Sequence, residues 1–421
     1  MSKLPEGWEY KKLKDLGVCI TGLTYKPEDV TDQGGLLVLR SSNVQSGRID
    51  FSDCVYVNAH VKSGSRTREG DILICVRNGS KSLIGKSAVI DKASEGVAHG
   101  AFMTLFRSRH GDFVRHLFNT DHYHREVNKN LGATINSINS GDLYGFKFPF
   151  PPKKEREKIS LILSTWDEAI STTERIVEIS QRKRHALMQQ LLTGKRRLPG
   201  FTVHPGERRE KYGDVPNDWE FIEIGSFSRQ SSEKNREAEE LPVLSCSKYD
   251  GFVDSLSYFN KRVYSEDLSG YKVIYRGDIG FPSNHVEEGS IGLQNLYDRG
   301  LVSPIYVVFR PDEERVDPEF LFRLLKTDHY RQVFAASTNA SVDRRGSLRW
   351  KEFSAIKVPL PSLDEQKAIV LALKTADAEI EAQQQRLDCL RQEKRALMQQ
   401  LLTGKRRVKV EATAPTEEAA C

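Results

Sequence analysis

Hydrophobic positions follow two different periods along the chain, and the two patterns alternate twice. Residues 34–44, 70–76 and 101–107 contain short apolar runs bounded by Gly, Asn and Ser, which is typical of short strands. Helical spacing follows such runs at 113–127 and 320–334. The pattern therefore predicts an α+β protein with two regions of mixed short strands and helices.

Each of these regions is followed by a long stretch of helical character. A proline-containing segment, at 148–152 and 358–361, closes the strand-rich part, since proline continues neither a ladder nor a helix interior. The chain then has no Pro or Gly until Gly194 in the first half and Gly404 in the second. At 362–365 the sequence SLDE predicts a capping box, in which the Glu side chain returns to the cap. Each helix would be roughly 60 Å long.

One face of both predicted helices carries a seam in alternating steps of three and four residues. A repeat of about 3.5 residues lets two helices keep one face together, so these two are predicted to pair as a coiled coil. The seam positions are Leu163, Trp166, Ile170, Thr173, Val177, Ser180, Arg184, Leu187 and Leu191 in the first helix and Leu373, Ala376, Ile380, Gln383, Leu387, Leu390, Lys394, Leu397 and Leu401 in the second.

The chain is an internal duplication. The string ALMQQLLTGKRR occupies residues 186–197 and returns letter for letter at 396–407. Shorter matches keep the same order, for example LPEGWEYKKL at 4–13 and VPNDWEFIEI at 215–224. Duplicated units usually associate around a twofold axis, and a twofold perpendicular to the helices makes them antiparallel. We therefore expect two similar domains whose long helices pair antiparallel about an internal pseudo-twofold axis.

Length, charge and cysteine usage narrow the class of protein. The 421 residues exceed what one core usually holds, and 63 Lys and Arg against 58 Asp and Glu leave a net charge of +5, compatible with nucleic-acid contact without indicating it. No apolar run approaches the roughly 18 residues of a membrane span, and the first residues contain no apolar signal core. Six cysteines without a CxxC pair favour a reducing compartment. We expect a cytoplasmic protein without membrane contact.

A search for catalytic motifs finds none that fits. Residues 80–87, SKSLIGKS, come close to a phosphate-binding loop, but Ser80 stands where the loop needs a glycine, which favours a strand-end turn. The [DNS]PP[YF] motif of amino-methyltransferases and a glycine-rich cofactor loop after a first strand are both missing from the sequence. His122 and His124 lack zinc-site partners and are interpreted as helix-surface residues. The sequence predicts a binding protein with no catalytic residue, no metal and no cofactor of its own.

The duplicated unit with its paired helices resembles the specificity subunit of type I restriction-modification systems. The matching strings are WEYKKLKDLG and WEFIEIGSFS at the unit starts, GDILICV and GDIGF, LVSPIYVVFR, the transitions FKFPFPPKKEREKI and IKVPLPSLDEQKAIV, and the helix end ALMQQLLTGKRR. The resemblance covers residues 4–407. The polar segment 408–421 lies outside it and is expected to be disordered.

The resemblance implies that each domain reads one half of a split site in double-stranded DNA. It also implies that the helices act as a spacer and dock two modification (methyltransferase) subunits. Those subunits bring S-adenosylmethionine and methylate adenine N6, and further motor-nuclease subunits bring ATP- and Mg-dependent restriction. Because the two domains differ outside the matching strings, the half-sites should differ too. The expected divisions are target-recognition domain 1 at 1–152, spacer helix 1 at 153–194, a linker at 195–214, target-recognition domain 2 at 215–362, spacer helix 2 at 363–404, and a basic end with a disordered tail at 405–421.

Candidate base readers are polar residues with forked or paired groups in turn-rich segments, because Arg suits guanine and Asn or Gln suits adenine. For any one of them a solvated turn or a phosphate contact remains the alternative, and Arg40 and Asn43, beside a strand, could be structural. The basic clusters 195–197 and 405–407 could contact phosphate or favour a helix C-terminus. The candidates are Arg40, Asn43, Gln45, Arg77, Asn78, Lys81, Asn136 and Asn139 in the first domain and Asn284, His285, Asn339, Arg344, Arg345 and Arg349 in the second.

Two other classes of function remain open at this point. One is a self-sufficient methyltransferase or nuclease fused to recognition units, which cofactor binding by the purified chain would reveal. The other is a coiled-coil scaffold without a DNA role, whose binding would be indifferent to DNA sequence and to salt.

Overall fold

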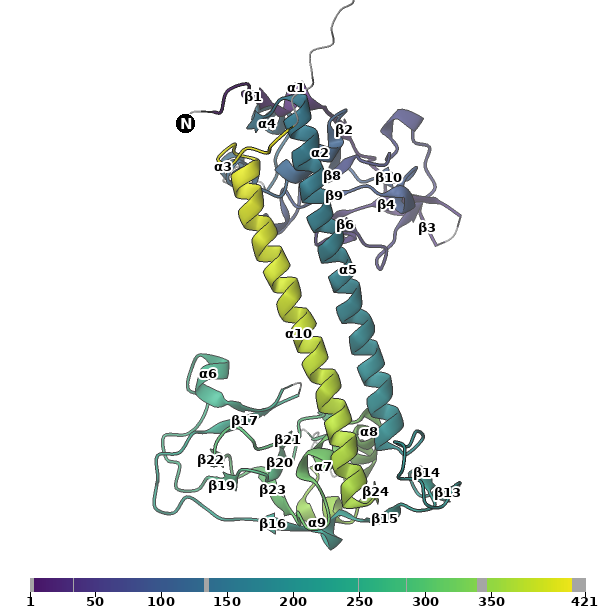
Figure 1. Cartoon of the computed structure of the whole chain (residues 1–421), viewed down its shortest axis with the longest axis vertical. Helices are drawn as coiled ribbons and strands as arrows, with labels where there is room; N and C mark the ends of the chain where they lie inside the picture. Colours follow the sequence, from purple (N-terminus) through teal and green to yellow (C-terminus); the bar gives the residue numbers. More distant parts are fainter. Residues whose placement is uncertain are drawn as a thin grey trace, which may run out of the picture. The chain divides into compact units, whose positions relative to one another are not determined.

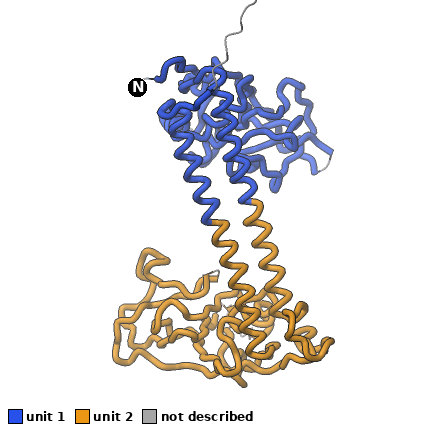
Figure 2. Tube along the Cα trace, viewed as in Figure 1, with its two compact units in different colours: residues 1–174, 385–421 blue, residues 175–384 orange. Residues whose placement is uncertain are grey.

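The computed structural model describes residues 4–32, 34–131, 136–248, 250–284, 286–338 and 347–410. Two compact units divide the chain, one formed by residues 1–174 with 385–421 and the other by 175–384 (Figure 2). The long helices α5 (Lys153–Leu192) and α10 (Leu363–Leu401) each contribute to both units. Each unit therefore combines the strand-rich region of one repeat with the start of its own helix and the end of the other repeat's helix.

Among its described residues the first unit contains short strands and four short helices, and Figure 1 labels these helices and most of the strands. The strands are β1 (Glu9–Lys12), β2 (Val18–Thr21), β3 (Val30–Thr31), β4 (Leu36–Leu39), β5 (Val44–Gln45), β6 (Arg48–Ile49), β7 (Tyr56–Val57), β8 (Ile72–Cys75), β9 (Ser87–Val89), β10 (Ala98–His99), β11 (Met103–Arg107) and β12 (Lys147–Phe150). The helices are α1 (Leu13–Leu16), α2 (Gly111–Leu117), α3 (Asp121–Asn130) and α4 (Ser140–Gly145).

The main sheet of the first unit has the strand order β2-β11-β8-β9, and all its pairs are antiparallel. A second sheet has the order β10-β4-β7-β3, and β1 pairs with β12. Strand β8 is buried along its whole length, as its uninterrupted apolar run ILIC requires. The segment SKSLIGKS forms a short 3₁₀ turn, Lys81–Leu83, that leads into β9, which agrees with the predicted strand-end turn.

The second unit repeats this plan with its own insertions. Its strands are β13 (Glu207–Glu210), β14 (Gly213–Pro216), β15 (Glu220–Glu223), β16 (Ser228–Ser231), β17 (Leu244–Ser247), β18 (Gly251–Asp254), β19 (Lys272–Tyr275), β20 (Ile279–Pro282), β21 (Gly292–Leu293), β22 (Arg299–Val302), β23 (Tyr306–Pro311) and β24 (Lys357–Leu360). Its short helices are α6 (Ser255–Phe259), α7 (Pro318–Leu325), α8 (Asp328–Ser337) and α9 (Trp350–Ser354).

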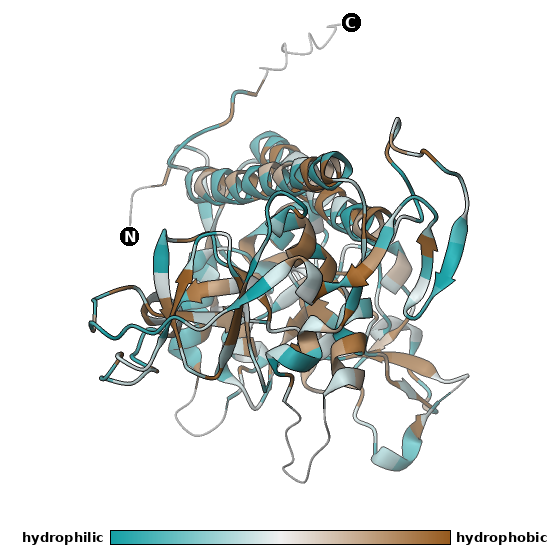
Figure 3. Ribbon diagram, turned by 90° about the horizontal axis from the view of Figure 1, so that it is seen from below, coloured by the Kyte–Doolittle hydropathy of each residue, from teal (hydrophilic) through white to brown (hydrophobic). Residues whose placement is uncertain are grey.

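The sheet order β16-β23-β20-β21 of the second unit repeats that of β2-β11-β8-β9, and β15–β24 repeats β1–β12. Helix starts are capped in the same way in both units, since Thr120 and Thr327 accept the backbone N–H of Tyr123 and Tyr330. The strands of the cores are coloured mostly as hydrophobic and the connecting turns mostly as hydrophilic in Figure 3.

In the first unit α5 and α10 run antiparallel. Lys394 pairs with Asp167 and Arg391 with Glu174, so residue numbers fall along one helix as they rise along the other. The end of α10 also enters the core of this unit, where Leu401 is buried.

The second unit uses the complementary parts of the same helices. Arg184 pairs with Asp377 and Arg197 with Glu365, again in antiparallel order, and Leu191 at the end of α5 is buried in the core. The twelve large apolar side chains of the seam are all buried or half-buried, namely Leu163, Trp166, Ile170, Val177, Leu187, Leu191, Leu373, Ile380, Leu387, Leu390, Leu397 and Leu401. The predicted fold class, with two similar α+β domains and paired antiparallel helices, is confirmed.

Two details differ from the expectation. The hydroxyl of Ser362 accepts the backbone N–H of Glu365, as a capping box requires, but the Glu365 carboxylate does not return to the cap. It binds Trp219 and Arg197 instead, which satisfies two buried donors rather than one exposed N–H. The segment 195–214, expected to be a linker, contributes β13 and part of β14 as well as Arg197, whose side chain is only 12% exposed.

Candidate nucleic-acid interface

A buried carboxylate holds the start of the first domain to both long helices. Glu155, in the first turn of α5, accepts hydrogen bonds from the Trp8 indole at 3.2 Å and from Arg407, which follows α10. Glu155 is almost fully buried, and these donors compensate its carboxylate for the water that it loses. We call this arrangement of Trp8, Glu155 and Arg407 the first clasp.

The second clasp has the same geometry and one more acidic partner. Glu365 accepts from the Trp219 indole at 3.1 Å and from Arg197 Nε at 2.6 Å. Arg197 also donates to Asp218 at 2.6 Å, and its guanidinium lies 5.3 Å from the Trp219 ring centroid. Hydrogen bonding from Arg197 lowers the pKa of Asp218 to about 2. Arg197 and Arg407 thus serve the clasps, whereas Lys195, Arg196, Lys405 and Arg406 remain exposed.

The turn after β4 contains two candidate base readers, Arg40 and Asn43, and the structure contradicts the prediction for Asn43. Asn43 is fully buried, donates to the carbonyl oxygens of Asp50 and Asp53, and accepts the backbone N–H of Arg40. It therefore stabilises the turn and has no free edge for a base. Arg40 donates to the Asp53 carboxylate at 2.8 Å, while its buried Nε has no hydrogen-bond partner in the described part of the chain.

Three further candidates converge beside the end of β8. Arg77 is exposed, and its guanidinium carbon lies 5.7 Å from the ring centroid of Phe102. Asn78 donates to the hydroxyl of Ser41 at 3.0 Å, and Asn136 donates to the carbonyl of Gly79 at 3.0 Å. The structure thus brings together segments that are far apart in the sequence.

The remaining candidates of the first domain lie apart from this group or have a structural role. Gln45 accepts from Lys86 Nζ at 3.3 Å, and Lys81 is exposed on its 3₁₀ turn. Asn139 is exposed and has a structural role as well, because its side-chain oxygen accepts the backbone N–H of Asp142 and caps α4.

In the second domain only part of the candidate set can be placed. Asn284 is half-buried just after β20, and Arg349 is exposed at the N-cap of α9. The other candidates, His285, Asn339, Arg344 and Arg345, lie outside the described residues.

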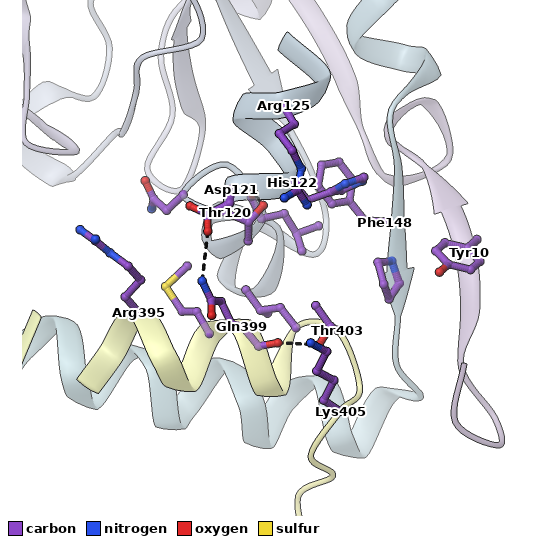
Figure 4. A pocket seen from close by; sticks show the side chains of 15 residues that line it. Tyr10, Thr120, Asp121, His122, Arg125, Phe148, Arg395, Gln399, Thr403 and Lys405 are labelled. Atoms are coloured by element: carbon purple, nitrogen blue, oxygen red, sulfur yellow. Dashed lines mark hydrogen bonds between the residues drawn. The ribbon is translucent and has the colours of Figure 1, made fainter. Parts of the chain in front are cut away.

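Both units contain a cavity where the end of a long helix meets a short one. The pair is α10 and α3 in the first unit and α5 and α8 in the second. In the first unit a cavity of about 420 Å³ lies among Tyr10, Thr120, His122, Thr403 and Lys405 (Figure 4), with Gln399 donating to Asp121 at its side. The corresponding cavity of the second unit measures about 230 Å³. Its lining includes the equivalent residues Phe221, Thr327, His329, Thr193 and Lys195, together with Tyr212 from the β13–β14 hairpin.

A family model described as type I restriction modification DNA specificity domain matches the chain twice, at residues 5–181 and 216–391. The chain belongs to this family. Each match covers one specificity domain and most of the long helix that follows it. The chain is therefore a type I restriction-modification specificity subunit with DNA target recognition.

Related proteins carry names of the same family, and they match this chain over most of their length. A Methanocaldococcus jannaschii protein assigned as the MjaX specificity subunit of a type I restriction enzyme is 29% identical over 97% of this chain and 96% of its own. The EcoKI specificity subunit of Escherichia coli is 26% identical over 87% of this chain and 82% of its own. A chain in a structure on complex assembly of the type I R-M system is 18% identical, covers 96% of this chain and 100% of its own, and has a TM-score of 0.56, which supports the fold.

Two features of the specificity domains were missed from the sequence. The clasps have a signal, because Trp, Glu and Arg recur in both repeats, at Trp8 and Trp219, at residues 155 and 365, and at residues 197 and 407. The exposed ring of Phe102 has no such signal, since an apolar residue in a strand-like run is expected inside.

Proposed function

We propose that this specificity subunit selects a bipartite, asymmetric DNA target, with one half-site read by each specificity domain. The observation that carries the proposal is the double match of one specificity family to two domains whose polar residues after the equivalent strands β8 and β20 differ. At the end of β8 the first domain has Arg77, whereas Asn284 follows the equivalent strand β20. Arg and Asn favour different bases, so two unlike half-sites are expected.

The paired helices are proposed to set the distance between the half-sites. Half-sites read from one face of DNA lie about 34 Å apart or a little more. A helix of 40 residues, as in α5, is roughly 60 Å long and can set such a distance.

The helices are also proposed to dock two modification subunits. Leu161 on α5 and Leu371 on α10 occupy the same position in the two repeats and are 61% and 67% exposed. Neither belongs to the seam, whose side chains pack between the two helices. An exposed leucine at the same position of both repeats fits two equivalent copies of one partner. S-adenosylmethionine, ATP and Mg would belong to the modification and motor-nuclease subunits, in the cytoplasm. No described helix could cross a membrane.

A domain exchange tests the division of labour. Replacing residues 215–362 with a domain from another specificity subunit should keep the first half-site and the spacing and change the second half-site. The methylated motif in genomic DNA is the readout. A chimaera that altered both half-sites, or neither, would contradict the proposal.

Lengthening α5 and α10 by one turn each tests the spacer. Both half-sites should persist, and the gap should widen by up to about 5.4 Å, or one to two base pairs. An unchanged gap in the methylated motif would show that the helices do not set the distance.

The docking surface is tested by the double variant Leu161→Lys, Leu371→Lys, which should lose modification subunits because a lysine without a partner is costly to bury. The matched control is Thr172→Lys with Ala382→Lys, an exposed pair at the same repeat offset about three turns further along each helix. Native mass spectrometry of the assembled complex counts the bound subunits. Two bound subunits in the leucine variant would exclude this surface.

A further inference from the structure

The two specificity domains share one junction of three segments. In the first domain the backbone N–H of Val76, just after β8, donates to the carbonyl of Phe102 at 2.9 Å, and the Val76 carbonyl accepts from Ile138 at 2.9 Å. In the second domain Ser283, just after β20, donates to Ile305 at 3.3 Å and accepts from Leu348 at 2.8 Å. These bonds make Phe102 and Ile305 equivalent, and likewise Arg77 and Asn284, which follow Val76 and Ser283.

At this junction both domains expose an apolar side chain next to a polar one with a forked end. Phe102 is 57% exposed and Ile305 is 45% exposed, whereas the residues that follow them, Met103 and Tyr306, are buried. A single exposed apolar residue needs no explanation, but its return at the same place in two divergent domains does. Arg77 contacts Phe102 in the first domain, and the half-buried Asn284 directly follows Ser283, whose backbone is bonded to Ile305, in the second.

A cavity beside Phe102 adds a second observation. It measures about 740 Å³ and is lined by Tyr25, Phe102, Arg40 and Ser42 among others. Two of these lining residues each carry a buried polar atom without a hydrogen-bond partner in the described ranges, namely the Nε of Arg40 and the hydroxyl of Ser42. Buried polar atoms are normally satisfied, so a small shift of these side chains towards a polar ligand in the cavity would complete two hydrogen bonds.

We infer that this junction is the specificity-determining contact of each domain, and the inference rests on the proposed function of reading two half-sites. Arg77 donates two hydrogen bonds to O6 and N7 of a guanine, while Phe102 packs against the neighbouring base. Asn284 pairs with N6 and N7 of an adenine, and Ile305 contacts the methyl group of a thymine. These pairings follow from the major-groove edges of the bases. Arg40 and Ser42 take polar atoms of the nucleotide next to Phe102.

Arg77 is suited to this role by its surroundings. Its guanidinium is exposed and pairs with no carboxylate in the described part of the chain, and the ring of Phe102 holds it by a cation–π contact. A guanidinium positioned in this way loses less freedom on binding than a free one.

The test uses the chain assembled with its modification subunits in cells, with the methylated genomic motif as readout. Arg77→Gln should reduce the preference for guanine at one position of the first half-site by about 10- to 100-fold and leave the second half-site and the spacing unchanged. Asn284→Ala should do the same at one adenine of the second half-site. The matched control is Arg68→Ala, which removes another exposed arginine of the first domain and should leave the motif intact.

Arg77→Lys separates base reading from charge, because it keeps the positive charge and loses the fork. Loss of the guanine preference in Arg77→Lys with total methylation retained supports base reading. An unchanged motif in both Arg77 variants would overturn the inference and make Arg77 a phosphate contact at most. The proposed function would survive that result, because it fails only if exchanging residues 215–362 alters both half-sites or neither.

Discussion

The two units are built on one plan, and one place where they differ is where the chain leaves a long helix. After α5 the chain continues into the second domain and forms the β13–β14 hairpin, which brings Tyr212 into the cavity beside Phe221. The first unit has no such hairpin among its described residues, and its corresponding cavity is larger, about 420 Å³ against 230 Å³. A connecting segment has thus become part of the core of one unit only.

The clasps also differ, and again the second unit is the more closely packed of the two. In the second unit Arg197 has two carboxylate partners and its side chain is 12% exposed. In the first unit Gly7 stands in the place of Asp218, and the Arg407 side chain is 48% exposed. The same three residue types therefore form a buried network in one unit and a half-solvated one in the other.

Removing the acid of each clasp should have the largest effect on stability and should differ between units. Glu365→Ala leaves Arg197 buried with one partner fewer and Trp219 without an acceptor, so we expect a loss of about 3 to 5 kcal/mol. In Glu155→Ala water can solvate Arg407, and the main cost is the unsatisfied Trp8 indole, about 1 to 2 kcal/mol.

Hydrogen exchange of the full chain, read separately for each unit, measures both changes. Glu365→Gln is the control, because its amide oxygen can still accept from the Trp219 indole. Equal losses in the two units would show that burial of the arginine does not matter.

A second difference lies where a short helix packs against each long helix. His116 of the first unit is buried 3.8 Å from Asp167, and its Nε2 has no hydrogen-bond partner among the described residues. In the second unit the equivalent Arg323 pairs with Glu319 and Asp377. Burial lowers the pKa of His116 to about 3, so the ring is neutral at pH 7 and its approach to Asp167 is not an ion pair.

This difference predicts that mild acid destabilises the first unit more than the second. The unfolded chain protonates His116 near pH 6.5 and the folded chain only near pH 3, so the unfolded state binds more protons between these values. Stability then falls as the pH falls through this window, by about 3 kcal/mol at pH 4. Unit-resolved hydrogen exchange at pH 7 and pH 4 measures it. His116→Gln should reduce the difference but not remove it, because burial also lowers the pKa of His99, His110 and His124 in the first unit. A first unit that keeps its stability at pH 4 would contradict the burial of a neutral His116.

The fold could be predicted from the sequence because its signals are periodic and repeated. The seam keeps its steps from Leu163 to Leu191 and again from Leu373 to Leu401, and such regularity reports helix pairing without any tertiary information. The clasps could not be assigned in this way. Trp8 and Glu155 are 147 residues apart, and only the folded chain brings them together.

The candidate site was predicted only in part, for a physical reason. Asn and Arg residues in turns can bind a base, but they can equally satisfy the backbone of their own turn, as Asn43 and Asn139 do. Conversely, Phe102 lies in an apolar run whose next residue, Met103, is buried, and the run does not reveal which member faces outward.

The hairpin should contribute the smallest of these effects. Tyr212 packs edge-on against Phe221, with ring centroids 6.0 Å apart, and is half-buried. Tyr212→Ala should therefore destabilise the second unit by about 1 kcal/mol. It should also enlarge the cavity of this unit, so that its volume becomes more like that of the corresponding cavity in the first unit. Tyr10→Ala is the matched control, because Tyr10 occupies the position of Phe221 in the first unit and is exposed there, so its loss should cost less. Urea unfolding followed by hydrogen exchange in each unit measures both variants. If Tyr10→Ala cost as much as Tyr212→Ala, the hairpin would not be what distinguishes the two cavities.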